Sequence, residues 1–181
     1  DNLLIDFDTG YPLSVNWNLS DGVTAVTENC AILESVAVRC WGSNGEGQIG
    51  VGSTLNNYQT PSTSGNVSFP VNYGAVQIGT YANGAGSMAV LENGDVYLWG
   101  KNRPSSGNGL GFSCHSGSYT NGCDGNENLL TPSPMILPVG SQARAIYAAS
   151  YAYYGHKCVV FDGGTAACVG NNEDGQLGDG T

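Results

Sequence analysis

A three-fold internal repeat constrains this chain more than any other feature of its sequence. Each copy holds two short apolar runs that are joined by a turn and followed by (Trp or Val)-Gly-x-Asn, and the copies occupy residues 30–44, 88–102 and 158–172. Two apolar runs around a short turn are typical of a β-hairpin, and self-similarity at a long period is typical of a repeat protein. The sequence therefore predicts an array of β-hairpins.

The similarity extends beyond the hairpins on both sides. Each copy opens with an apolar residue, a proline and an aliphatic residue, at positions 11–13, 69–71 and 137–139. The first and third copies continue to Gly-Gln-(Ile or Leu)-Gly at 47–50 and 175–178, and the middle copy has a degenerate form at 108–111. These flanking motifs indicate long repeats rather than a chance resemblance between short strands.

Composition predicts an all-β fold without membrane insertion. Glycine contributes 28 of 181 residues and charged residues only 11%, and no long segment has the 3.6-residue apolar period of a helix. No apolar run approaches the ~18 residues that a membrane helix needs. The net charge is −10 with five scattered Lys and Arg, so no basic patch is available for nucleic acid. The start at Asp1, without a leader, predicts a processed form or an excised part.

Four of the six cysteines occupy equivalent repeat positions. The two hairpin positions hold Cys30 and Cys40 in the first copy, Met88 and Leu98 in the second, and Cys158 and Cys168 in the third. Both cysteines are replaced together, as expected for a bonded pair, because a single replacement would leave a free thiol. Opposed residues in a non-hydrogen-bonded pair of antiparallel strands have Cα atoms about 4.5 Å apart, at the short end of disulfide geometry. We therefore expect two cross-strand disulfides.

The other two cysteines, Cys114 and Cys123, bracket a Gly- and Ser-rich insertion in the second copy. A third disulfide that pins this insertion is the simplest interpretation, and the alternative is a metal site that includes His115. Zinc sites usually combine two close-spaced ligand pairs, whereas the second histidine, His156, is remote in sequence. We therefore expect a disulfide and neither metal nor cofactor. Disulfides indicate an oxidising compartment, and hence an extracellular protein.

Two glycosylation sequons agree with an extracellular location. Asn18 and Asn66 each begin an Asn-x-Ser tripeptide. Such tripeptides also arise by chance in a chain rich in asparagine, so they support the location without establishing it.

Several residues that recur after the hairpin are expected to serve the repeat fold. The tryptophans could form a carbohydrate platform, but a repeated aromatic residue more often fills the wedge between neighbouring sheets. The glycines would allow a tight exit from the strand, and the asparagines could bond turn backbone. The set consists of Trp41, Gly42, Asn44, Trp99, Gly100, Asn102, Gly170 and Asn172.

The hairpin turns differ between copies at one position. Gly94 and Gly164 fit the third residue of a three-residue turn, which has positive φ. The first copy has Val36 there. This replacement predicts a different turn in the first copy.

A tyrosine-rich segment precedes the third hairpin, with Tyr147, Tyr151, Tyr153 and Tyr154 close together. The segment could be an ordinary strand and loop. It could also be a contact surface, because tyrosine supplies contact area at low entropic cost. The sequence leaves both interpretations open.

Motifs for catalysis and calcium binding are incomplete. Asp8-Thr9-Gly10 resembles the aspartic protease triplet, but that chemistry requires paired carboxylates, and the chain has no second such triplet. Residues 171–179 offer oxygen ligands without the order of an EF-hand loop. No Ser/His/Asp arrangement is visible either. We therefore do not expect an enzyme.

The combination of an apolar hairpin, Trp-Gly-x-Asn and Gly-Gln-(Leu or Ile)-Gly-x-Gly resembles the repeat of the regulator of chromosome condensation family. The resemblance covers residues 11–181 and is clearest at 41–52 and 170–180. It implies a β-propeller of four-stranded blades, usually seven of them. The founding member is a nucleotide exchange factor on chromatin, whereas other relatives are light sensors or secreted inhibitors of β-lactamases, so the fold leaves the function open.

We accordingly expect an all-β, propeller-type chain of about three blades, with a ring that is incomplete within one chain. The expected divisions are a blade-completing N-terminal strand at 1–10, repeat 1 at 11–67, repeat 2 at 68–136 with a disulfide-pinned insertion at 112–128, and a truncated repeat 3 at 137–181. Either the chain is a window from a longer array, or copies complement one another head to tail.

Two functions from different classes fit these observations. The first is a secreted, non-catalytic structural scaffold of an extracellular ring or filament, which is built by contacts of the chain with copies of itself. The alternative is a secreted protein- or glycan-binding module, of the adhesin or inhibitor type, that is excised from a larger propeller. The incomplete repeat count and the cysteines favour the first.

Overall fold

The computed structural model describes residues 4–5, 12–14, 21–55, 60–61, 64–81, 84–101, 128–148, 156–170 and 172–180, the first two segments by their backbone alone. Within these residues the fold is all-β and contains no helix, and hence no helix that could cross a membrane. Predicted residues that lie outside the described segments are Asn18, Asn102, Cys114, Cys123, Tyr151, Tyr153 and Tyr154.

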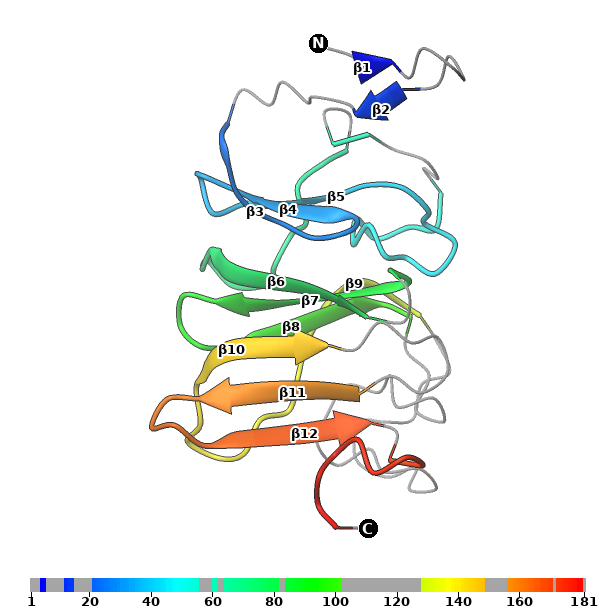
Figure 1. The fold of residues 1–181 in the computed structure, drawn as a ribbon. Helices are drawn as coiled ribbons and strands as arrows, with labels where there is room; N and C mark the ends of the chain where they lie inside the picture. The colour runs from blue at the N-terminus through cyan, green and yellow to red at the C-terminus, as the bar shows by residue number, and fades with distance from the viewer. Residues whose placement is uncertain are drawn as a thin grey trace.

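The strands form three antiparallel sheets that stack as successive blades (Figure 1). Blade 1 contains β3 (Val23–Val26), β4 (Cys30–Leu33) and β5 (Val38–Cys40); blade 2 contains β6 (Ala75–Tyr81), β7 (Gly86–Leu91), β8 (Val96–Gly100) and β9 (Leu129–Pro134); blade 3 contains β10 (Ala143–Ala148), β11 (His156–Phe161) and β12 (Ala166–Gly170). A small additional sheet pairs β1 (Leu4–Ile5) with β2 (Pro12–Ser14). Figure 1 shows β1 and β2 at one end of the stack and blade 3 at the other. The sheets of the described residues do not close into a ring, so this part of the chain forms a partial propeller.

The predicted hairpins occupy the middle of each blade, and all three close with the same turn. In blade 2 the amide of Leu91 donates to the carbonyl of Asp95, and the amide of Gly94 donates to the carbonyl of Leu91, both at 2.9 Å. The corresponding bonds are present in blades 1 and 3. The prediction of a different turn in the first copy is therefore wrong: Val36 adopts a φ of 59° where Gly94 has 81°.

The glycines that follow the hairpins all have left-handed φ values, which are 88° at Gly42, 89° at Gly100 and 135° at Gly170. Space restricts Gly100 as well as its backbone angle. A Cβ at this position would lie 2.5 Å from the carbonyl oxygen of Ala85 and 2.8 Å from the Cα of Gly86. Only glycine fits here without a backbone shift.

A fourth strand lies on the outer edge of blade 2. There β9 pairs with β8, and the amide of Met135 donates to the carbonyl of Val96 at 2.7 Å. Blade 1 has a shorter version of the same pairing, because Asn66 bridges Arg39 and the amide of Val67 donates to the carbonyl of Val38 at 2.8 Å. In blade 3 the strand order ends at β12 within the described residues.

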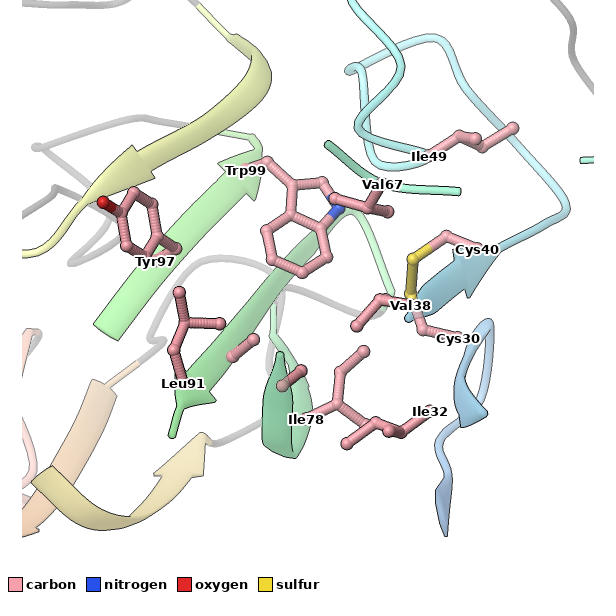
Figure 2. Packing of buried hydrophobic residues seen from close by; sticks show 12 residues of the cluster. Cys30, Ile32, Val38, Cys40, Ile49, Val67, Ile78, Leu91, Tyr97 and Trp99 are labelled. Carbon is pink, nitrogen blue, oxygen red and sulfur yellow. A yellow bond between two sulfur atoms is a disulfide. The ribbon is translucent and has the colours of Figure 1, made fainter. Parts of the chain in front are cut away.

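The core lies between the blades rather than on one side of a single sheet. One cluster joins residues of blade 1, such as Ile32 and Val38, to residues of blade 2, such as Leu91 and Trp99 (Figure 2). A second cluster joins the opposite face of blade 2 to blade 3. Blade 2 is therefore buried on both faces, and all six residues of β7 and all five of β8 are buried. This arrangement explains why these two strands read as continuous apolar runs.

Candidate interaction surface

Trp99 shows how one repeat packs on the preceding repeat. Its indole is fully buried, and its Nε1–H donates to the carbonyl of Gln48 at 2.9 Å. A Cβ on Gly50 would lie 2.8 Å from the ring, so the Gly-Gln-Ile-Gly turn of repeat 1 lies directly against this indole. Phe69 completes the site with an edge-to-face contact at 5.9 Å. The repeated tryptophan is thus a core residue at this junction, not a carbohydrate platform.

The turn that receives Trp99 is built by Asn44. Its Nδ2–H donates to the carbonyl of Ser53 at 2.7 Å, and its Oδ1 accepts from the amide of Ile49 at 3.1 Å. Asn172 holds the turn of repeat 3 in the same manner, because its Oδ1 accepts from the amide of Leu177 at 2.9 Å. These bonds hold both turns in the same way and give Asn172 a structural role in its turn. Among the described residues no cluster of His, Cys, Asp and Glu could hold a metal ion.

A second repeated contact joins each hairpin turn to the following blade. The carbonyl of Val36 accepts from the amide of Ala75 at 3.0 Å, and the carbonyl of Gly94 accepts from the amide of Ala143 at 2.8 Å. In each case the residue that precedes the donating amide lies against the turn residue: Gly74 lies against Val36, and Gln142 lies against Gly94.

At the first junction a Cβ on Gly74 would lie 2.0 Å from the Cγ2 of Val36, and at the second a Cβ on Gly94 would lie 2.6 Å from the Cβ of Gln142. Each junction therefore accommodates one side chain and requires glycine opposite it. This contact explains Val36: its side chain occupies space that Gly74 leaves open, which offsets the cost of its left-handed backbone.

Gln77 joins the innermost strands of blades 2 and 3. Its Nε2–H donates to the carbonyl of Ile146 at 3.0 Å, and its Oε1 accepts from the amide of Ile146 at 2.8 Å. The amide side chain thus replaces the pair of bonds that a neighbouring strand would make. Ala25 and Ala145 occupy the corresponding strand positions in blades 1 and 3, so this contact distinguishes the second junction from the first.

Lys157 is fully buried at the same junction. Its Nζ lies 4.6 Å from the centroid of the Tyr81 ring, a cation–π contact. Tyr81 is also buried, and its hydroxyl donates to the main chain at Trp99 or Lys101, with oxygen separations of 3.2 and 3.0 Å. Burial lowers the pKa of Lys157 from 10.5 to about 7, because desolvation disfavours the charged ammonium. Burial also raises the pKa of Tyr81.

The outward face of blade 3 repeats the composition of the faces that are buried inside the stack. We define it by the repeat positions Cys158, Val160, Ala166, Cys168 and Leu177. In blade 1 the same positions are Cys30, Ile32, Val38, Cys40 and Ile49, and each is at most 2% exposed. In blade 3 four of them are half-buried and Ala166 is exposed. Gly164 and Gly178 have nothing within 4 Å of a built Cβ, whereas their counterparts Gly94 and Gly50 contact the next blade.

At the opposite end of the stack, three residues of blade 1 are exposed or half-buried, although their counterparts in blade 2 are buried against the preceding blade. Val23 is 49% exposed and Val26 is 61% exposed, and Trp41 is half-buried. Their counterparts in blade 2 are Ala75 and Ile78, at 1% and 8% exposed, and the buried Trp99.

The structure also places the remaining predicted residues. Disulfides join Cys30 to Cys40 and Cys158 to Cys168, each with a Cα–Cα distance of 4.0 Å. The sequon residue Asn66 is exposed, and its Oδ1 accepts from the Nε–H of Arg39 at 2.8 Å. Tyr147 is 64% exposed on β10.

Sequence reasoning did not identify Gln77, Gly74 or Lys157. The repeat alignment contained a signal for Gly74 and Val36, because a glycine in the turn and a glycine before the next strand alternate between junctions. Gln77 and Lys157 are unique to their repeats, so no repeat pattern could have found them.

The stacked antiparallel blades resemble part of an RCC1-like β-propeller. No protein family model matches the chain. Among solved structures, it resembles Prp20p of Saccharomyces cerevisiae, described by its binding to Gsp1p and histones, with a TM-score of 0.58 and 26% identity over 82% of this chain and 31% of that chain.

Two further structures show the same fold. Yeast RCC1 (Prp20) bound to Kap60 matches with a TM-score of 0.58 and 21% identity, over 83% of this chain and 32% of that chain. Human WBSCR16 matches with a TM-score of 0.56 and 15% identity, over 93% and 39% respectively. The chain thus spans about a third of the length of these propellers.

Proposed function

We propose that this chain is a secreted, non-catalytic structural scaffold, which builds an extracellular ring or filament by head-to-tail contacts with copies of itself. The outward face of blade 3 is the main support for this proposal. The equivalent faces of blades 1 and 2 are each buried by the blade that follows them. A second copy offers the matching side through Val23, Val26 and Trp41 of blade 1. Both faces are largely apolar, as expected of a stable contact.

Three observations support the wider description. The two cross-strand disulfides agree with an oxidising, extracellular location. Asn66 is exposed, which agrees with a glycan at this sequon. The solved neighbour Prp20p is described by its binding to other proteins, which agrees with a protein-binding role for this chain. We do not propose these partners for this chain, because the two disulfides agree with an oxidising, extracellular location.

Electron microscopy and sedimentation velocity on the purified 181-residue chain test this function. We expect rings or filaments built from an 18.7 kDa unit. A Val160→Glu variant places a charge on the outward face of blade 3 and should remain a monomer, because burying an unpaired carboxylate is costly. Val139→Glu is the matched control, because Val139 is fully exposed and lies outside this face.

Near-ultraviolet circular dichroism confirms that both variants keep the native fold. Wild-type chain that sediments as a monomer at every concentration would overturn the proposal. That outcome would favour the alternative, a protein- or glycan-binding module of a larger propeller, and a partner would then be sought by pull-down.

A further inference from the structure

Among the described residues, no strand covers the outer edge of β12 in blade 3. In blade 2 the same edge, that of β8, is covered by β9. In blade 1 the edge of β5 is covered by Asn66 and Val67. Within the described residues β12 pairs only with β11. An unpaired edge presents a row of amides and carbonyls that can accept another strand.

The segment that covers this edge always precedes the Pro-marked opener of the following repeat. Residues 129–134 precede Pro138, and residues 66–67 precede Pro70. The first opener, Pro12, is preceded by residues 2–8. These begin with Asn-Leu-Leu, and so does the covering segment at 128–130, at the same distance from its proline. The N-terminal segment thus carries the sequence of a fourth strand.

Among the described residues, no blade is placed to use that strand in this way. The edges of blades 1 and 2 are already covered, and Figure 1 shows β1 and β12 at opposite ends of the stack. We propose that residues 3–8 of one chain add as the fourth strand to the edge of β12 in a second copy. This proposal rests on the proposed head-to-tail function, for which it specifies the joining segment.

The pairing of β8 with β9 fixes the register of the added strand. Tyr97 lies opposite Pro134, Leu98 opposite Ser133 and Gly100 opposite Leu129. The equivalent pairs are Ala167 with Asp8, Cys168 with Phe7, and Gly170 with Leu3. Leu4 would correspond to Leu130, whose side chain and carbonyl contact the turn of the preceding repeat at Gly47 and Gly52.

The contact that β1 makes in the single chain is small enough to be exchanged. β1 has two residues and pairs with β2 through an irregular register, with Leu4 opposite Ser14 and Ile5 opposite Pro12. Pro12 has no amide to donate, and an isolated two-stranded pairing of this size is marginal in water. Transfer to the edge of β12 replaces it with a longer ladder on a three-stranded sheet.

The prolines of β9 provide a matched pair of test variants. Met135 donates its amide toward β8, and Ser133 shares that orientation because alternate amides of a strand face the same neighbour. Pro132 and Pro134 alternate with these two residues along the strand and have no amide hydrogen to donate. Phe7 corresponds to Ser133 and Asp6 to Pro132, so Phe7→Pro should prevent the added pairing whereas Asp6→Pro should permit it.

The test combines hydrogen exchange with peptide competition on the full chain. In the assembled chain the β12 amides should exchange at least about tenfold more slowly than in dilute monomer, because new ladder bonds protect them. Synthetic peptides of residues 1–10 should occupy the β12 edge and shorten the assemblies. The Asp6→Pro peptide should act like the wild-type peptide, and the Phe7→Pro peptide should have no effect.

The outcomes separate this proposal from the proposed function. Strand donation would be overturned if the β12 amides of the assemblies exchange as fast as those of the monomer and the peptides do not shorten the assemblies. That result would leave the scaffold proposal intact. Absence of assemblies together with peptide-dependent protection of β12 would support strand acceptance and overturn the scaffold. Absence of both effects would overturn both.

Discussion

At the scale of single residues, the paired positions at the blade junctions explain two residues that look unfavourable where they stand. Val36 adopts a left-handed φ of 59°. Gly74 precedes a strand, where a residue with a side chain would lose less backbone entropy on folding than glycine does. Each is understandable only with the other, because the side chain of Val36 fills the space that Gly74 leaves. The second junction meets the same steric requirement with Gly94 and Gln142.

This reciprocity predicts a strong coupling between the two residues. Gly74→Ala should destabilise the chain by about 1–3 kcal/mol through overpacking, because its Cβ would lie 2.0 Å from Val36. Adding Val36→Gly should restore most of the loss, and a double-mutant cycle by urea denaturation measures the coupling. Gly45→Ala is the control, because nothing lies within 4 Å of its Cβ position. Additive effects of the two substitutions would contradict the argument.

Lys157 predicts a pH dependence of stability. Its pKa is about 7 in the folded chain and its ordinary value is 10.5, so between these values the unfolded chain binds a proton that the folded chain does not. The free energy of unfolding should therefore rise with pH across this window, by up to about 1.4 kcal/mol per pH unit. Below pH 7 both states are protonated and the contribution is constant.

Denaturation of Lys157→Met between pH 7 and 9 tests this dependence. The variant should be more stable than wild type at pH 7, and its stability should lack the rise that Lys157 contributes. Lys101→Met removes one lysine elsewhere and should keep the rise. Equal slopes in wild type and Lys157→Met would show that the buried lysine does not set the dependence.

At the scale of strands and sheets, the blades share their hairpins but are joined by different polar contacts. The first junction depends on Trp99 and the turn at Gln48. The second adds the two hydrogen bonds between Gln77 and Ile146. Because Ile146 is buried, its backbone groups have little access to water if the side chain of Gln77 is removed.

Gln77→Ala should therefore destabilise the chain by about 1–3 kcal/mol, measured as a lower midpoint of urea denaturation. Gln142→Ala removes one exposed hydrogen bond to Asn93 and keeps the Cβ that lies against Gly94. It should change stability by no more than about 0.5 kcal/mol. Comparable losses in both variants would show that the bonds to Ile146 have no special weight.

At the scale of the whole molecule, stability depends on which blade faces are covered. Blade 2 is covered on both faces, whereas the outward face of blade 3 stays half-buried. In a repeat array each unit is stabilised mainly by contacts with its neighbours, so blade 3 gains most from a second copy.

Self-association should thus make the melting temperature depend on chain concentration. A hundredfold rise in concentration can add up to about 2.7 kcal/mol to the apparent stability, which corresponds to several degrees for a chain of this size. Differential scanning calorimetry of wild type and Val139→Glu should show this rise, and Val160→Glu should melt at one temperature throughout. A wild-type melting temperature that is independent of concentration would argue against the assembly.

The sequence by itself determined the local features of this protein, because they depend on residues that are near one another in the chain. Apolar runs around short turns specify the hairpins, and the paired replacement of cysteines by Met88 and Leu98 indicates the cross-strand disulfides. The exit glycines at 42, 100 and 170 follow from the backbone angle that the turn requires. The three copies of the repeat predict three blades, and the structure has three.

Only the tertiary structure decided how the blades meet. Val36 retains the turn of its glycine counterparts because Gly74, far along the chain, leaves space for its side chain. Gln77 and Lys157 acquire their roles from residues of another blade, and no periodic pattern marks them. The physical reason is that sterics and backbone angles act over a few residues, whereas burial depends on whichever surface the fold brings into contact.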